Sequence, residues 1–258
     1  QKARIDNGRV LEAEYLETTL TDVDLKIILD QYTFDDIVCF DVHHSRYGKL
    51  PYVMTDVVKD YFRKKTELKD VPGQEVQYMK SKNKVNACYG MTAQDPVKQD
   101  VIFDNGDWSE ASEDVEDLLN KSNEKAFLCY QWGVWVTAHA RRELQEMLKI
   151  AGHNAVYCDT DSVKYVGTAD FTEYNETIME RSKANGAFAT DINGRVHYMG
   201  IAEPDGHYTQ FKTLGAKKYV FTKPGSDAVH VTIAGVNKKR GGPELQRAGG
   251  VAAFAPGF

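Results

Sequence analysis

The sequence predicts an α+β fold, in which helices and strand pairs occupy different parts of the chain. Three observations predict it. Apolar residues recur at helical spacing in residues 54–69, 74–89 and 130–150. Residues 153–167 place two β-prone runs around a polar turn, which is typical of a strand–turn–strand unit. The runs at 217–223 and 228–236 indicate two further strands.

The first elements are expected in the order extended segment, helix, strand. Residues 9–32 begin extended and then turn into a helix, for which Thr21 is a suitable N-cap with acidic residues in the first turn. Residues 34–42 are rich in Ile, Val and Phe and favour a strand.

The next two helices form a predicted antiparallel hairpin. Helix 54–69 is amphipathic, the VPG run at 71–73 breaks it, and the second helix ends at Gly90. Residues 95–125 are acidic and weakly periodic, so we expect an insertion with little structure of its own. Ala151 and Gly152 close the long helix that follows.

Composition is that of an ordinary globular protein. Of the 258 residues, 42% are hydrophobic and 27% charged. No apolar run reaches the roughly 20 residues of a membrane span, and the N-terminus lacks the apolar core of a signal peptide. We therefore expect a cytoplasmic protein without a membrane partner. The chain lacks an initiator Met and a charged tail, so we also expect both ends to be cut.

Cysteines and charge restrict the kind of site. The four cysteines form no CxxC pair, which argues against a zinc site or a disulfide framework and favours reduced thiols. The net charge is −6, although nucleic-acid phosphates favour basic partners. Basic residues cluster at 63–65, 80–84, 217–218 and 238–240, whereas acids concentrate at 104–124. A basic cleft on an acidic body is consistent with both facts.

The sharpest feature is the run AVYCDTDSVKYV, in which β-prone residues flank Asp159, Thr160 and Asp161. Strand side chains alternate, so we expect both acids on one side, about 7 Å apart at Cα. A divalent cation would neutralise them, and Mg²⁺ prefers one or two carboxylates plus substrate phosphates. A DxD run alone also occurs in Ca²⁺ loops, in glycosyltransferases and in ordinary turns.

A second feature is a polar stripe on the helix at 74–89. Lys82, Asn86 and Tyr89 are spaced i, i+4 and i+7 and so lie along one side. A cation, an amide and a phenol suit the phosphates, sugar and base of a nucleoside triphosphate, and Gly90 permits close approach of a base pair. An exposed helix whose Tyr covers a neighbour is the alternative interpretation.

Together these segments resemble two motifs of family B DNA polymerases. Lys82, Asn86, Tyr89 and Gly90 match the family's K-x-x-x-N-S-x-Y-G motif B, with Ala87 in place of Ser. Residues 157–162, YCDTDS, match motif C in full. Lys217 and Tyr219 resemble the K-x-Y element, and TTLTDVDLKII, GVWVTAHAR and TIAGVNKK are similar to segments of the protein-primed phage branch.

The resemblance implies a polymerase palm, an antiparallel sheet with packed helices, that carries a helical fingers hairpin and a partial thumb. The implied parts are a palm-proximal segment at 1–53, fingers at 54–93, an acidic insertion at 94–126, a palm at 127–225 and a thumb portion at 226–258. In this branch the insertion encloses DNA.

The resemblance also implies roles for individual residues. Asp159 and Asp161 would hold two Mg²⁺ ions, with Mn²⁺ as the alternative cation, and Lys82 would contact the triphosphate. Lys69 is a candidate for a second phosphate contact. The remaining implied residues are Asn86, Tyr89 and Gly90 for the dNTP, and Tyr157, Thr160, Lys217 and Tyr219 for the primer-template DNA.

The family's motif A, D-x-x-S-L-Y-P, is not present in the chain. We therefore expect weak Mg²⁺ binding and little or no activity from this chain alone. A separate chain that supplies motif A and a terminal priming protein are the further partners that the resemblance leaves open. The alternatives are an inactive DNA-binding remnant of a prophage and a DxD glycosyltransferase, which would explain Asp159 and Asp161 but not the lysine-bearing stripe.

Overall fold

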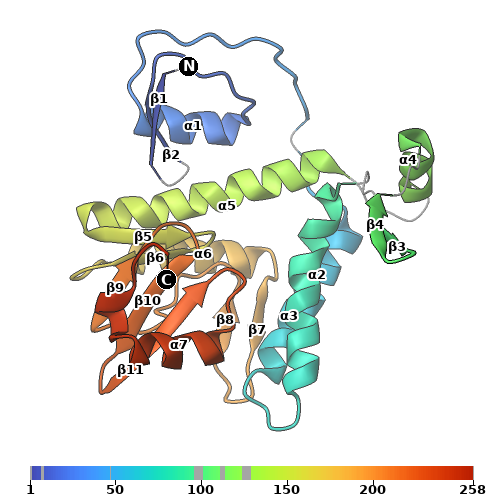
Figure 1. Cartoon of the computed structure of the whole chain (residues 1–258). Helices are drawn as coiled ribbons and strands as arrows, with labels where there is room; N and C mark the ends of the chain where they lie inside the picture. The colour runs from blue at the N-terminus through green and yellow to red at the C-terminus, as the bar shows by residue number, and fades with distance from the viewer. Residues whose placement is uncertain are drawn as a thin grey trace. The chain divides into compact units, whose positions relative to one another are not determined.

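The computed structural model describes residues 2–6, 9–46, 48–95, 101–110, 114–123 and 129–257 (Figure 1). Within these residues it has seven α-helices and eleven strands, and every strand pairing is antiparallel. The predicted α+β class is therefore confirmed. None of these helices combines the length and apolar character that a membrane span needs.

The chain divides into two compact units. Unit 1 comprises Gln1–Leu20, Glu143–Asp170 and Glu203–Phe258, and unit 2 comprises Thr21–Arg142 and Phe171–Ala202. Helix α5 (Tyr130–Ala151) contributes residues to both units, and it confirms the long helix predicted from the sequence.

Unit 1 is built from antiparallel strands. Two pairs are β1 (Ala3–Asp6) with β2 (Arg9–Ala13), and β5 (Ala155–Asp159) with β6 (Ser162–Tyr165). A three-stranded sheet has the order β11 (Ser226–Ile233), β10 (Lys218–Lys223), β9 (Gln210–Thr213). The strand–turn–strand unit and the two C-terminal strands predicted from the sequence are thus present.

The core of unit 1 lies on one face of this sheet. Val220, Val229 and Val231 point to the same side, because strand residues alternate, and they pack against Leu245 and Phe254. Leu245 belongs to α7 (Lys238–Arg247), and Phe254 follows the 3₁₀ turn η3 (Gly250–Ala253). The opposite face of the sheet is left for aromatic side chains.

Unit 2 contains the predicted helical hairpin. It holds α1 (Asp22–Gln31), α2 (Tyr52–Leu68), α3 (Glu75–Gly90), the 3₁₀ turn η1 (Met91–Ala93), α4 (Val115–Asn123) and α6 (Thr172–Ala184). Its strands are β3 (Val101–Asp104), β4 (Asp107–Glu110), β7 (Phe188–Thr190) and β8 (Val196–Tyr198). Helices α2 and α3 pack together, and Lys84 Nζ donates to Tyr61 Oη across the pair at 3.0 Å.

Two expectations about unit 2 were wrong. Residues 34–42 form no strand, because no partner strand pairs with them in the described chain and their apolar side chains, such as Val38 at 71% exposure, stay in solvent. The described part of the acidic segment 95–125 is not structureless but contains the β3–β4 hairpin and α4; residues 96–100, 111–113 and 124–125 lie outside the described residues. The predicted end of the second helix at Gly90 is confirmed, since α3 spans Glu75–Gly90 and the chain continues into η1 with Gly90 at a φ of −57°.

Candidate functional site

The DTD run lies at the tip of the β5–β6 hairpin in unit 1. Asp159 is the last residue of β5 and pairs in register with Ser162, so the intervening Thr160 and Asp161 form the turn. Thr160 has a φ of +49° and donates its hydroxyl to Asp159 Oδ1 at 2.9 Å. Strand alternation ends at Asp159 and therefore does not place Asp161 on the same side. Strand alternation thus gives no support for a shared side, and the pairing of the two acids stays a prediction.

The charge of Asp159 is balanced by a side chain of the same unit. Lys217 Nζ lies 2.7 Å from Asp159 Oδ1 and 3.0 Å from Oδ2. The hydrogen bond from Lys217 holds the pKa of the Asp159 carboxyl below its usual value, and the same contact raises the pKa of Lys217. The sequence argument that these acids require a cation did not consider this lysine.

Asp161 differs from its neighbour. Its side chain is exposed, and no hydrogen bond or ion pair joins it to another residue within the described ranges. Asp161 is therefore the carboxylate of this hairpin that is free to bind an external cation, while Asp159 would first have to release Lys217.

The K-x-Y element and motif C come together in unit 1. The backbone N–H of Lys217 donates to Tyr157 Oη at 2.9 Å, and the rings of Tyr157 and Tyr219 lie 5.0 Å apart. Lys217 adopts a φ of +57°, which turns the chain where β10 begins. Two segments separated by about sixty residues in the sequence, both singled out by the same resemblance, are thus neighbours through three contacts: an ion pair, a hydrogen bond and a ring pair.

The hairpin has two carboxylates, Asp159 and Asp161, which is a number that suits a nucleotide-bound Mg²⁺ site. Mg²⁺ at nucleotide sites is bound by one or two carboxylates, with phosphates and water as the remaining ligands. Among the described residues, no group of three or more His, Cys, Asp or Glu side chains is placed to hold a metal ion. Joint binding of a cation by Asp159 and Asp161 therefore stays a prediction, and a substrate would have to supply further ligands.

The predicted nucleotide stripe lies in unit 2 on α3. Lys82, Asn86 and Tyr89 are all exposed, Tyr89 at 41%. No side-chain hydrogen bond or ion pair joins Lys82 or Asn86 to another part of the described chain. A Cβ placed on Gly90 would meet nothing within 4 Å, so the backbone there is open. Lys69, the C-cap of α2, is exposed too. These side chains are available to a ligand.

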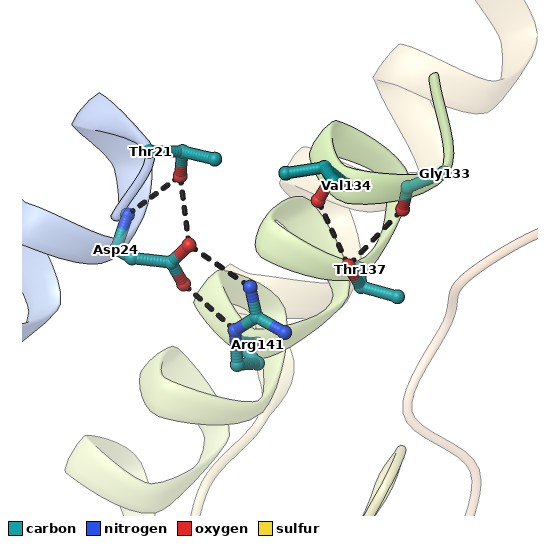
Figure 2. Close-up of polar contacts among 6 residues, drawn as sticks. All are labelled: Thr21, Asp24, Gly133, Val134, Thr137 and Arg141. Atoms are coloured by element: carbon teal, nitrogen blue, oxygen red, sulfur yellow. Dashed lines mark hydrogen bonds and ion pairs between the residues drawn. The ribbon is translucent and has the colours of Figure 1, made fainter. Parts of the chain in front are cut away.

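A partly buried ion pair in unit 2 was not predicted from the sequence. Arg141 on α5 donates through Nε and Nη2 to the two carboxylate oxygens of Asp24 on α1, at 2.7 and 2.9 Å (Figure 2). Thr21 Oγ1 accepts from the Asp24 N–H and donates to its carboxylate, which confirms the predicted N-cap. The hydrogen bonds from Arg141 hold the pKa of Asp24 below its usual value.

This ion pair adjoins the end of the stripe. The hydrogen bond with Asp24 raises the pKa of Arg141 most, and the charges of Asp24 and of ionised Tyr89 add smaller contributions in the same direction. Helix α5 also touches η1, since a Cβ on Gly133 would lie 2.7 Å from Ala93 Cβ and 2.9 Å from Thr92 Oγ1. No local pattern in the sequence indicates the pairing of Asp24 with Arg141, because the two residues are 117 positions apart.

Comparison with known proteins adds no relative: no protein-family model matches the chain, and no curated protein or solved structure matches it significantly. Asp161 lies in unit 1 and Lys82 in unit 2. Joint binding of one dNTP by these two residues therefore stays a prediction.

Proposed function

We propose that this chain is part of a family B DNA polymerase and takes part in template-directed transfer of a nucleotide from a dNTP to a primer 3′ hydroxyl. The observation that supports the proposal best is the meeting of Tyr157, Asp159, Lys217 and Tyr219 in unit 1. Residues that resemble two motifs of the same family, about sixty positions apart in the sequence, contact one another. The open stripe of Lys82, Asn86 and Tyr89 supplies the third motif.

In this proposal the two units carry different tasks. In unit 2, Lys82 binds the triphosphate and offsets the charge that develops as the α-phosphate is attacked, while Asn86 and Tyr89 contact the sugar and base. In unit 1, Tyr219 and Lys217 contact the primer-template. Asp159 and Asp161 would hold Mg²⁺, which when bound activates the 3′ hydroxyl and stabilises the leaving pyrophosphate.

The proposal is tested by dNTP binding and primer extension. We expect the purified chain to bind a dNTP with Mg²⁺ and to extend a primer weakly or not at all, because motif A is missing from the sequence. Lys82→Gln should weaken dNTP binding by about tenfold, the loss of one charge-assisted contact of roughly 1.4 kcal/mol. Lys26→Gln removes an exposed lysine of α1 and serves as the matched control. Equal dNTP affinity of Lys82→Gln and the parent chain would contradict the proposal.

The second candidate is a catalytically inactive DNA-binding remnant. The ion pair of Asp159 with Lys217 favours it, since that carboxylate is satisfied without a cation. A remnant should bind primer-template DNA with an affinity that does not change when Mg²⁺ and dNTP are added, whereas the polymerase proposal predicts tighter binding under those conditions.

A further inference from the structure

A hollow of about 420 Å³ lies in unit 2 between α2 and α3. Its polar lining includes Tyr61, Lys64, Gln77, Lys80, Ser81 and Lys84. The members from α3 are spaced three or four residues apart and so share one face of the helix. Lys82 lies about 200° from Lys80 around the helix axis, at 3.6 residues per turn, so this face is distinct from the proposed nucleotide stripe.

The lysines of this hollow are poorly neutralised. Lys64 pairs with Asp60 at 2.6 Å. Lys84 instead donates to the neutral Tyr61 hydroxyl, with its Nζ 5.0 Å from the centre of that ring. No hydrogen bond or ion pair joins the Lys80 side chain to another described residue. Two of the three ammonium groups therefore have no carboxylate partner in the described chain, and the hollow attracts anions.

A second observation is that Ser81, which also lines the hollow, carries a hydroxyl. Ser81 is only 6% exposed, and its hydroxyl has no hydrogen-bond partner among the residues that the structure describes. The Ser81 hydroxyl is not among the fully enclosed polar atoms of the described residues, so water can reach it and a ligand in the hollow can take the place of that water. An oxygen of such a ligand would accept the hydrogen bond of the hydroxyl.

We propose that the hollow binds a phosphate group, with Lys80 and Lys84 contacting its oxygens and Ser81 donating a hydrogen bond. A phosphate offers several acceptor oxygens and a charge that matches two ammonium groups and a hydroxyl. The group comes either from the backbone of single-stranded DNA or from a free nucleotide. Neither source requires the catalytic roles proposed above.

Two binding measurements test the site. The affinity of the whole chain is measured for a fluorescent oligothymidylate by anisotropy at several salt concentrations, and for inorganic triphosphate by calorimetry. The double variant Lys80→Gln/Lys84→Gln should lose about tenfold in affinity, and its salt slope for the oligonucleotide should fall by about 1.4, since each phosphate contact on a single strand contributes about 0.7. Ser81→Ala should bind severalfold more weakly with an unchanged slope.

The matched control is Lys59→Gln, which removes the same charge from α2 but from a residue that pairs with Asp56 and does not line the hollow. Loss of oligonucleotide binding alone assigns the site to DNA, and loss of both ligands assigns it to a phosphate group of either source. Binding of both ligands by the double variant as tightly as by Lys59→Gln would overturn the proposal, as would no binding by the parent chain. Failure of the polymerase proposal is read separately, from Lys82→Gln.

Discussion

The DTD hairpin of unit 1 and the α3 stripe of unit 2 were predicted with similar arguments, but their polar side chains have different partners in the structure. The hairpin acid Asp159 is held by Lys217 at 2.7 Å and is partly shielded, with 28% of its side chain exposed. The stripe residues Lys82 and Asn86 point into solvent without a side-chain partner in the described chain.

The difference shows that polar residues in a suggestive pattern can be satisfied in two ways. In the hairpin, Lys217 neutralises the charge of Asp159, so a cation that binds Asp159 has to compete with this lysine. The stripe has no internal competitor, so a ligand meets side chains that only water solvates. Binding at the stripe should therefore depend on how firmly α3 is held, and binding at the hairpin on how readily Lys217 leaves.

Gly133→Ala should have the largest effect, and it tests how the stripe is held. A methyl group at this position would lie 2.7 Å from Ala93 Cβ, directly after α3. Overpacking of this kind costs about 1–3 kcal/mol, and the higher helix propensity of Ala returns up to about 1 kcal/mol. We expect the free energy of unfolding to fall by about 2 kcal/mol or less, measured by urea denaturation, with weaker dNTP binding.

The control for this substitution is Gly90→Ala. This helical glycine has open space around it, so the same added methyl group should leave stability unchanged or slightly raised. If both variants unfold at the same urea concentration, the contact between α5 and η1 does not support the stripe.

Asp24→Asn should have the next largest effect, because it breaks the two hydrogen bonds to Arg141. The arginine is half exposed, at 52%, so we expect a loss of about 1 kcal/mol, near the upper end for solvent-screened ion pairs. The pKa of Asp24 is lowered in the folded chain, so its contribution is present above the unfolded pKa of about 3.9 and is lost as pH falls through the lower folded pKa.

Urea denaturation at pH 7 and at pH 3 measures this difference. The gap between the parent chain and Asp24→Asn should narrow at the lower pH. Asp22→Asn, in the same first turn and exposed, should show little loss. An equal loss in both aspartate variants would mean that the helix terminus, and not the ion pair, is responsible.

The elements that could be predicted from the sequence are those whose signal is local. Helix α5 and the hairpin of α2 and α3 follow from apolar spacing, and the Thr21 cap follows from its residue type. The strand predicted at 34–42 failed because β-propensity does not supply a partner strand. Helix α6 and strands β7 and β8 were not assigned, since their signal lies in contacts such as Ser182 Oγ to Met199 O, at 2.9 Å.

The candidate site was predicted as residues but not as contacts. Motif spacing singled out Asp159, Lys217 and Tyr219, yet nothing in the sequence indicated that the lysine would neutralise the aspartate, because that contact spans 58 positions. The same holds for Asp24 and Arg141, which are 117 positions apart. Pairings at such separations are fixed by the fold and not by local pattern.

Lys217→Gln should have the smallest effect and tests the hairpin side of the comparison. If Lys217 competes with a cation for Asp159, its removal should tighten Mn²⁺ binding by up to about fivefold, since two unit charges about 4 Å apart interact by about 1 kcal/mol in water. Calorimetric titration of the chain with Mn²⁺ measures this. Lys218→Gln removes the neighbouring exposed charge without touching Asp159 and should change the affinity less. Asp161→Asn should weaken Mn²⁺ binding in both backgrounds. Weaker Mn²⁺ binding in Lys217→Gln would show instead that the lysine positions the hairpin for the cation. The hairpin would then have no internal competitor for its ligand, as is the case for the α3 stripe.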